Sequence, residues 1–164
     1  GQIDAGSQSS ELATTMDLLP TFCSLTGANL PEKKLDGFDI SPLLFGEKAA
    51  KSQYEAFFYY RRRQLQAVRM GDWKYHFPLN ETHPRWTSAS PTGPGRNAKL
   101  VNLSDDLQEQ KNVDAANPKI VEQMNRLAQQ AIETLGNDNK TGSEQRPAST
   151  LKSSGAMRLS ASKK

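Results

Sequence analysis

The strongest hydrophobic pattern in the chain predicts an amphipathic helix near its C-terminal end. Asn117 and Pro118 form a typical helix start, and Gly136 forms a typical helix end. Between them, large and small apolar residues recur at helical spacing and form one stripe. The stripe consists of Ile120, Met124, Leu127, Ala131 and Leu135. We therefore expect a helix with one buried face over residues 118–136.

An alternating pattern in the middle of the chain predicts antiparallel strands. Trp73, Tyr75 and Phe77 alternate with Lys74 and His76, which is typical of a strand with one buried face and one face in contact with solvent. The Gly-Asp pair just before this run is a two-residue hairpin signal. A hairpin is marginal by itself, so further strands are expected. The expected strands are 54–60, 64–70, 73–77 and 99–103.

Two short helices and one long loop complete the expected elements. Asp17 is the expected N-cap of a helix that ends at Gly27, and Ser41 is the expected cap of a helical turn that ends at Gly46. The segment 78–96 is rich in Pro, Ser, Thr and Gly and has few aliphatic residues, which indicates a long loop. Together these elements predict an α+β fold with a small antiparallel sheet of about four strands, packed by the C-terminal helix.

Composition adds a different expectation for the end of the chain. Residues 137–164 hold six Lys or Arg against two acidic residues, which gives this segment a formal charge of +4. The whole chain has a formal net charge of +3, so the remaining residues together carry −1. They also have few large apolar side chains to offset the entropy of ordering. We therefore expect a disordered basic tail over 137–164. It has no aromatic residue for base stacking, which excludes specific nucleic-acid binding as an expectation.

Other whole-chain features limit the function classes further. No apolar run approaches the roughly 20 residues that span a bilayer. The chain starts at Gly1 without an initiator Met or a signal-peptide pattern, which suits a piece of a longer polypeptide. The single cysteine, Cys23, excludes an internal disulfide.

Four segments resemble, in the same order, the motifs of sulfatases of the arylsulfatase type. Residues 11–27 (ELATTMDLLPTFCSLTG) are similar to "D-L-x-P-T" followed by an apolar run and Gly. Residues 35–46 (LDGFDISPLLFG) are similar to "L-D-G-x-s-l-x-P-L-L-x-G". Residues 67–75 (AVRMGDWKY) are similar to "A-V-R-x-G-x-W-K". Residues 100–113 (LVNLSDDLQEQKNV) are similar to "L-Y-D-L-x-x-D-P-x-E-x-x-N-L", with Leu107 in place of the usual proline.

The resemblance implies a division of the chain. Residues 1–50 would be the end of the large sulfatase α/β domain, with its last helix, and a connector. Residues 51–136 would be the C-terminal subdomain. The implied partners are the missing N-terminal catalytic domain of the same polypeptide and, for the intact enzyme, a sulfated small molecule or glycan. The family also suggests an exported or lysosomal location, although no targeting signal is visible in these residues.

The resemblance further implies chemistry that this chain does not carry. Sulfatases of this type use a formylglycine made from the Cys of a C-x-P-x-R motif, and they use a calcium ion, which needs several oxygen ligands. Cys23 is followed at the second and fourth positions by Leu25 and Gly27, so it does not match. The pair Asp105–Asp106 is more typical of a turn than of a metal site. We therefore expect no catalytic and no metal-binding residue here, with calcium and formylglycine in the intact enzyme only.

Other candidate residues concern the substrate rather than the catalytic centre. His83, Arg85 and Trp86 lie in the expected loop, where cationic and aromatic side chains suit the rim of a cleft for a sulfated substrate. His76 is expected to be exposed or structurally hydrogen-bonded. The run of three arginines at 61–63 is expected to be a solvated edge, because consecutive strand residues cannot all face one way.

Three readings remain open from the sequence. The first is a structural C-terminal sulfatase part that supports the large domain. The second is a stand-alone binding or scaffold domain that buries Leu18, Leu19 and Phe22 itself. The third is the same part of a related phosphate or phosphonate ester hydrolase, since a fold does not fix the reaction.

Overall fold

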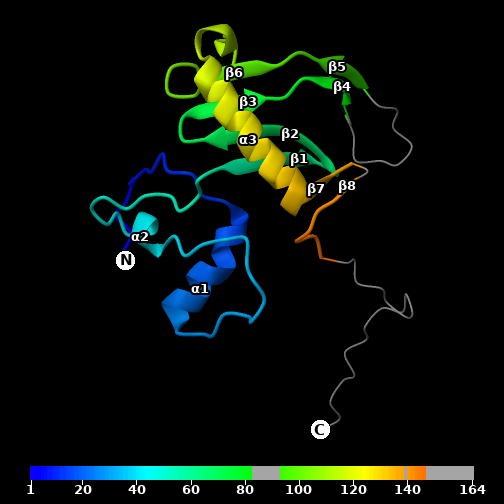
Figure 1. Ribbon diagram of the computed structural model, residues 1–164. Coiled ribbons are helices and arrows are strands. Elements are labelled where there is room, and N and C mark those ends of the chain that lie inside the picture. Colours follow the sequence, from blue (N-terminus) through cyan, green and yellow to red (C-terminus); the bar gives the residue numbers. More distant parts are fainter. Residues whose placement is uncertain (83–92, 139, 147–164) are drawn as a thin grey trace.

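The computed structural model describes residues 1–82, 93–138 and 140–146 (Figure 1). The helices are the 3-10 turn η1 (Thr15–Asp17), α1 (Leu18–Thr26), α2 (Ser41–Leu44), the 3-10 turn η2 (Asp114–Ala116) and α3 (Pro118–Thr134). The strands are β1 (Phe57–Arg61), β2 (Gln64–Met70), β3 (Trp73–His76), β4 (Leu79–Thr82), β5 (Gly93–Arg96), β6 (Lys99–Asn102), β7 (Gly136–Asn137) and β8 (Lys140–Thr141). No helix within these described residues is long and apolar enough to cross a membrane.

One four-stranded antiparallel sheet forms the centre of the fold, in the order β1-β2-β3-β6. Helix α3 crosses one face of this sheet (Figure 1). The expected α+β fold, with about four strands packed by the C-terminal helix, is therefore confirmed. The expected hairpin is also present, since β2 and β3 pair on either side of Gly71, whose φ is 55°. The other two expected strands are β1 and β6.

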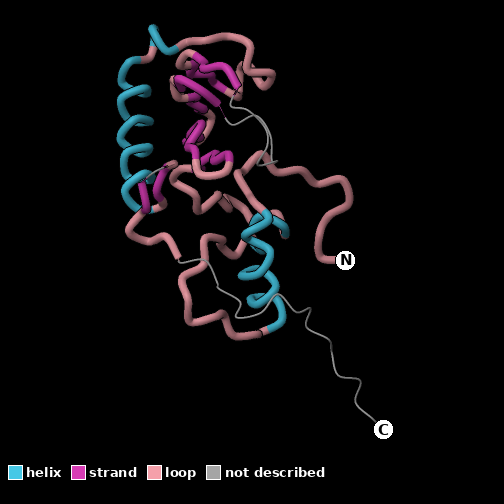
Figure 2. The backbone as a smooth tube through the Cα atoms, turned by 90° about the vertical axis from the view of Figure 1, so that its right-hand side faces the viewer, coloured by secondary structure: helices cyan, strands magenta, loops and turns pink. Residues whose placement is uncertain are grey.

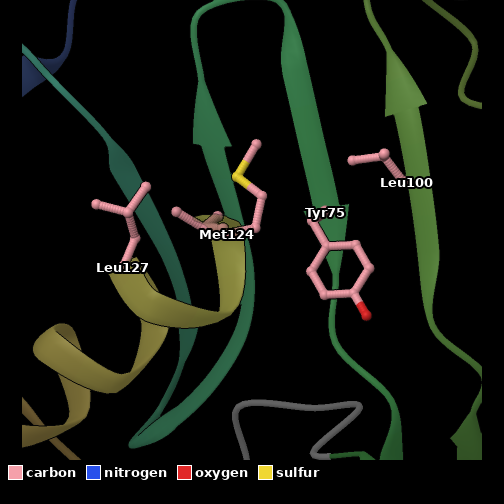
Figure 3. Packing of buried hydrophobic residues seen from close by; sticks show 5 residues of the cluster. Tyr75, Leu100, Met124 and Leu127 are labelled. Atoms are coloured by element: carbon pink, nitrogen blue, oxygen red, sulfur yellow. The ribbon is translucent and has the colours of Figure 1, made fainter. Parts of the chain in front are cut away.

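The core lies between this sheet and α3. Alternate residues of β2 and β3 face the helix and contribute to this core, as the alternating pattern predicts. Figure 3 shows Tyr75 and Leu100 of the sheet beside Met124 and Leu127 of the helix. Leu100 and Met124 are fully buried, and the same cluster contains Val68 of β2. A second small cluster continues the contact toward the C-terminal end of α3, where Leu65 packs on two alanines of the helix.

The expected loop over 78–96 is partly wrong, because its two ends form the strands β4 and β5. Thr82 pairs with Gly93, so the two ends of the intervening segment lie side by side. Sequence composition favoured a loop here because these strands have no alternating apolar pattern. Their pairing instead depends on close backbone approach, since a Cβ at Gly95 would lie 2.3 Å from the Asn80 carbonyl oxygen. The segment 83–92 lies outside the described residues.

The N-terminal helices α1 and α2 lie apart from α3, beyond the edge of the sheet that β1 forms (Figures 1 and 2). Helix α1 ends as expected at Gly27, which has a φ of 70°. Asp17 stands at the expected N-cap position, but its side chain makes no capping hydrogen bond to α1. Thr14 caps η1 in a capping box. Its hydroxyl accepts from the Met16 N–H, and Asp17, at the N3 position, accepts from the Thr14 N–H. Asp17 is thereby left inside the fold rather than at a solvent-exposed helix start.

The C-terminal part of the described chain continues past α3. Gly136 pairs with Thr141, and Ser143 and Glu144 donate backbone hydrogen bonds to carbonyls of the last turn of α3. Described structure therefore extends to Arg146, beyond the expected start of the basic tail at residue 137. Residues 139 and 147–164 of that expected tail lie outside the described residues.

A network that joins the four motif segments

The first and second motif segments meet at one buried carboxylate. Asp17 has no exposed surface, and its side chain accepts hydrogen bonds from the Thr14 N–H (2.6 Å), the Phe38 N–H (2.9 Å) and the Tyr54 hydroxyl (2.6 Å). Burial by itself raises the pKa of Asp17, but these hydrogen bonds outweigh it and hold the pKa below its ordinary value. A charged carboxylate therefore links the start of α1 to the second segment and to Tyr54.

Two further contacts hold the same segments together. The Thr21 hydroxyl donates to the Asp17 carbonyl (2.7 Å) and accepts from the Ile40 N–H (3.0 Å). Gly37 of the second segment lies directly on the backbone before α1, because a Cβ there would be 2.0 Å from the Met16 carbonyl oxygen. These contacts give a structural reason for the presence of Asp, Thr and Gly at these positions of the two motifs.

A row of aromatic rings continues from this carboxylate to the sheet. Tyr54 contacts Phe38 (4.9 Å between ring centroids) and Phe57 (6.1 Å), and Phe57 contacts Tyr59 (5.0 Å), all edge to face. Such pairs add to the stability given by apolar burial. Tyr59 of β1 then faces the ammonium of Lys74, which lies 4.7 Å from the ring centroid. The row therefore ends at the third motif segment.

The third and fourth motif segments meet at a second carboxylate. Glu109 bonds to Lys74 Nζ (2.5 Å) and to His76 Nε2 (2.5 Å), and its carbonyl accepts from Lys99 Nζ. Burial raises the pKa of Glu109, but the hydrogen bonds and charges of Lys74 and His76 lower it further than burial raises it. The pKa of His76 is lowered, mainly by burial. These two directions are compatible with a neutral imidazole that donates to a carboxylate.

The fourth segment is held to the sheet by its other polar residues. Asn112 accepts from the Leu100 N–H (3.0 Å) and donates to the Ala98 carbonyl (3.2 Å), while Asp106 accepts from the Lys111 N–H (2.7 Å). Leu107, which stands where the motif has proline, is 82% exposed. Asp106, Glu109 and Asn112, which this chain shares with the motif, therefore make contacts, whereas the proline position is at the surface.

The structure places the candidate residues as follows. His76 is structurally hydrogen-bonded, one of the two outcomes expected for it. The expectation that its side of the strand faces solvent is wrong, because the fourth motif segment covers it and leaves Lys74 16% and His76 19% exposed. Cys23 is buried in α1, with its Sγ 3.8 Å from the Asn29 carbonyl oxygen. Within the described ranges, no three His, Cys, Asp or Glu side chains are grouped so that they could hold a metal ion. His83, Arg85 and Trp86 lie outside the described residues, so their expected place on a rim stays a prediction.

Sequence reasoning missed the importance of Tyr54 and of the Glu109 bridge. Tyr54 lies outside the four motif segments, and an aromatic residue before a strand gives no signal of its hydrogen-bond partner. The sequence did contain a signal for Glu109. Lys74 and His76 share one strand face, and only an acidic residue of the fourth motif could neutralise their positive charge. Chemically, the whole arrangement joins segments that are far apart in sequence.

The pKa of Tyr54 provides a direct test of the first part of the network. Burial, followed by the Asp17 carboxylate, raises the pKa of Tyr54 from 10.0 to about 12. Because the folded value lies above the unfolded value, the stabilisation is complete below pH 10 and is lost as the pH rises through 12. Burial also raises the pKa of Tyr60 and Tyr75. We therefore expect Tyr54→Phe to reduce the phenolate absorbance step at about 12 by the amplitude of one tyrosine. Tyr59→Phe is the matched control and must retain this step.

Comparison with known proteins gives the class to which this arrangement belongs. The family model described as the C-terminal region of aryl-sulfatase matches residues 52–156, which is more than half of the chain. The chain therefore belongs to the arylsulfatase family, as part of its C-terminal region.

Individual relatives agree with this class. The chain is similar to human arylsulfatase A, with 36% identity over 133 residues that cover 71% of this chain and 26% of the relative. It is also similar to human steryl-sulfatase, with 44% identity over 41% of this chain and 12% of the relative. The chain thus spans about a quarter or less of the length of these curated relatives.

Solved structures show the same fold. The crystal structure of Ps i-CgsB superposes with a TM-score of 0.57 and 21% identity, over 88% of this chain and 29% of that chain. A second structure, from work on glycosaminoglycan metabolism by Bacteroides thetaiotaomicron, has a TM-score of 0.52 and 24% identity over 69% of this chain and 23% of that chain. In each case the region that matches is a minor part of a longer protein.

Proposed function

We propose that this chain is a structural part of a sulfatase and supports the catalytic domain that performs sulfate-ester hydrolysis. In this proposal residues 1–50 complete the large domain and residues 51–136 form the C-terminal subdomain. The observation that carries the proposal is an uncovered apolar surface on α1. We call this surface the α1 ridge and define it as Leu18, Leu19, Phe22 and Leu25.

The α1 ridge is a single stripe with helical spacing. Its side chains are 46% (Leu18), 48% (Leu19), 58% (Phe22) and 49% (Leu25) exposed, while Pro20, Thr21 and Cys23 of the same helix are buried. A contiguous apolar stripe of this kind on a soluble protein marks a surface that another element covers. The occupant that fits is the preceding catalytic domain, since the relatives extend far beyond the part that this chain matches.

The network described above would transmit that contact to the sheet. Asp17 and Thr21 are buried beside the ridge, and they bind the second motif segment. The aromatic row then reaches β1 and Lys74. A domain docked on the ridge would therefore fix the position of the sheet as well as that of the helix.

The chemistry of the intact enzyme would come from outside these residues. The family implies a calcium ion and a formylglycine. The described residues offer no cluster of carboxylates for calcium, and Cys23 does not stand in the required motif. We therefore place the metal, the nucleophile and the catalytic residues in the preceding domain. His83, Arg85 and Trp86 are proposed to reach the cleft rim from the segment between the paired ends of β4 and β5.

The stand-alone reading is less compatible with the ridge. A domain that folds by itself would bury Leu18, Leu19 and Phe22, and these three side chains are about half exposed. The phosphate or phosphonate reading differs only in residues upstream of this chain.

Substitutions on the α1 ridge should change surface behaviour more than stability. We expect Leu19→Glu with Phe22→Glu to lower the free energy of unfolding of the chain by about 1 kcal/mol or less, because both side chains are about half exposed. The same change should remove most binding of a hydrophobic fluorescent dye. Leu107→Glu, at an exposed leucine away from the ridge, is the control and should keep the dye signal. Equal dye binding by all three proteins would contradict an uncovered docking surface.

The proposed function itself is tested by the coding sequence upstream of Gly1. An in-frame extension that encodes C-x-P-x-R or S-x-P-x-R together with a pair of aspartates supports it. A start codon immediately upstream, with no such extension, would refute it and favour a small interaction domain.

A further inference from the structure

Two turns that are far apart in sequence enclose a pocket at the end of the sheet where β1 turns into β2. The Tyr60 hydroxyl donates to the Gly136 carbonyl (2.9 Å), and the Leu65 N–H donates to the Asn137 side chain (2.8 Å). The Asp138 N–H donates to the Arg63 carbonyl (2.7 Å). These bonds fasten the β1–β2 turn to the β7–β8 hairpin. The pocket between them has a volume of about 230 Å³.

The polar lining of this pocket is mainly cationic or amide. Arg62, Arg63, Asn137 and Gln145 line it together with the Tyr60 ring. The sequence alone indicated a solvated edge for the three arginines, on the ground that consecutive strand residues face opposite ways. The structure removes this objection for two of them, because Arg62 and Arg63 lie in the turn between the strands. Their side chains therefore need not point to opposite faces of the sheet, as consecutive strand residues do.

The backbone of this turn is unusual for an arginine. Arg62 has a φ of 57°, a left-handed conformation that favours Gly or Asn. Strained backbone of this kind persists where surrounding contacts hold it, and it often occurs at binding sites. Here the holding contacts are the hydrogen bonds to the β7–β8 hairpin. These contacts therefore hold the turn that carries Arg62 and Arg63 at the edge of the pocket.

The charge balance around the pocket favours an anion. The guanidinium of Arg63 makes no hydrogen bond or ion pair with any residue in the described part of the chain, whereas Arg62 has partners of its own. The acidic residues next to the lining residues are Asp138, which has a partner of its own, and Glu144, which is paired with Lys34. The C-terminal end of α3 would also repel an anion, but its Glu133 and Thr134 carbonyls accept from Ser143 and Glu144 N–H groups.

We propose that this pocket binds a tetrahedral oxyanion, in the form of a sulfate or phosphate ester group. The planar fork of an arginine matches two oxygens of such a group at once. The volume is below the roughly 300–1,000 Å³ of sites for drug-sized ligands. It therefore suits one anionic group with a few attached atoms rather than a whole oligosaccharide. The site lies on the hairpin ends, so it would bind the same anion whether or not the α1 ridge docks onto a catalytic domain.

The experiment is a titration of the full chain, followed by amide and arginine side-chain NMR signals at constant ionic strength. The probes are inorganic sulfate, inorganic phosphate, glucosamine 6-sulfate and unsulfated glucosamine. We expect saturable shifts of the Arg63 side chain and of the Asn137 and Gln145 amides with the first three probes and none with the fourth. Tighter binding of glucosamine 6-sulfate than of phosphate would assign the site to sulfated sugars, and the reverse order would assign it to phosphate groups.

Two matched variants separate a built site from general attraction of anions. Arg63→Gln should weaken binding about tenfold or more, since it removes a charged fork. Arg126→Gln removes the same charge from the exposed face of α3, where it pairs with Glu122, and should change binding less than about twofold. Equal weakening by both variants would overturn the proposal. So would shifts in the unaltered chain that are not saturable or that centre on other residues, a result that does not depend on how the variants fold.

Discussion

Replacement of Asp17 by alanine is expected to destabilise the chain by about 3–5 kcal/mol. The carboxylate is fully buried and accepts three hydrogen bonds, and each donor left without a partner costs about 1–3 kcal/mol. Domains of this size are stable by only about 5–15 kcal/mol. The loss would therefore be a large part of the total. The measurement is the free energy of unfolding from urea denaturation.

Two further variants make the Asp17 result specific. Asp17→Asn keeps one accepting oxygen and should lose less than the alanine variant. Asp4→Ala removes an exposed aspartate and should change stability by no more than about 0.5 kcal/mol. The folded pKa of Asp17 lies below its ordinary value of 3.8, so its contribution is present above that pH and is lost as the pH falls through the folded value. A loss in Asp17→Ala no larger than that in Asp4→Ala would contradict the network.

Replacement of Met124 by alanine should have a comparable effect through a different cause. Met124 is fully buried between α3 and the sheet, in contact with the cluster that includes Leu100 and Tyr75 (Figure 3). Removal of its side chain leaves a cavity in a close-packed core, which costs about 2–5 kcal/mol. Urea denaturation again measures the loss. Leu135→Ala, near the end of the same helix at a side chain that is 42% exposed, should lose about 1 kcal/mol or less.

The two large losses should differ in what else they change. Met124→Ala loosens the contact of α3 with the sheet but leaves Asp17 and Tyr54 bonded to each other. The phenolate step of Tyr54 at about 12 should therefore persist in folded Met124→Ala. In Asp17→Ala the step should move part of the way toward the ordinary value of Tyr54, because burial, the larger cause of the raised pKa, remains while the carboxylate is gone. A step at the same pH in both variants would show that Asp17 does not act on Tyr54.

Periodicity predicted the sheet and α3 because both depend on a buried face that repeats along the chain. Trp73 to Phe77 alternate, and Ile120 to Ala131 recur at helical spacing, so the covered faces are visible in the residues themselves. Leu135 marks the limit of this reasoning, since it continues the stripe and yet is exposed at the end of the helix. Periodicity does not show where the covering surface stops.

The parts that the sequence did not predict depend on contacts between distant backbones. Pairing of β4 with β5 requires the missing side chain of Gly95, and the position of Asp17 inside the fold depends on the Phe38 N–H. Neither contact produces a local pattern. The pocket at Arg62 and Arg63 is a third case, because it exists only where two hairpins about 70 residues apart in the chain meet. Motif resemblance found the four segments, but only the structure shows that they touch.

That contact has a consequence for assigning activities across genomes. The four motif segments are joined to one another through Asp17, the aromatic row and Glu109. A sequence match to the four segments therefore indicates that a protein has inherited this architecture. It carries no information about which ester is cleaved. Open reading frames detected through these motifs alone should be grouped by ancestry, and their substrates should be assigned from the residues of a catalytic domain.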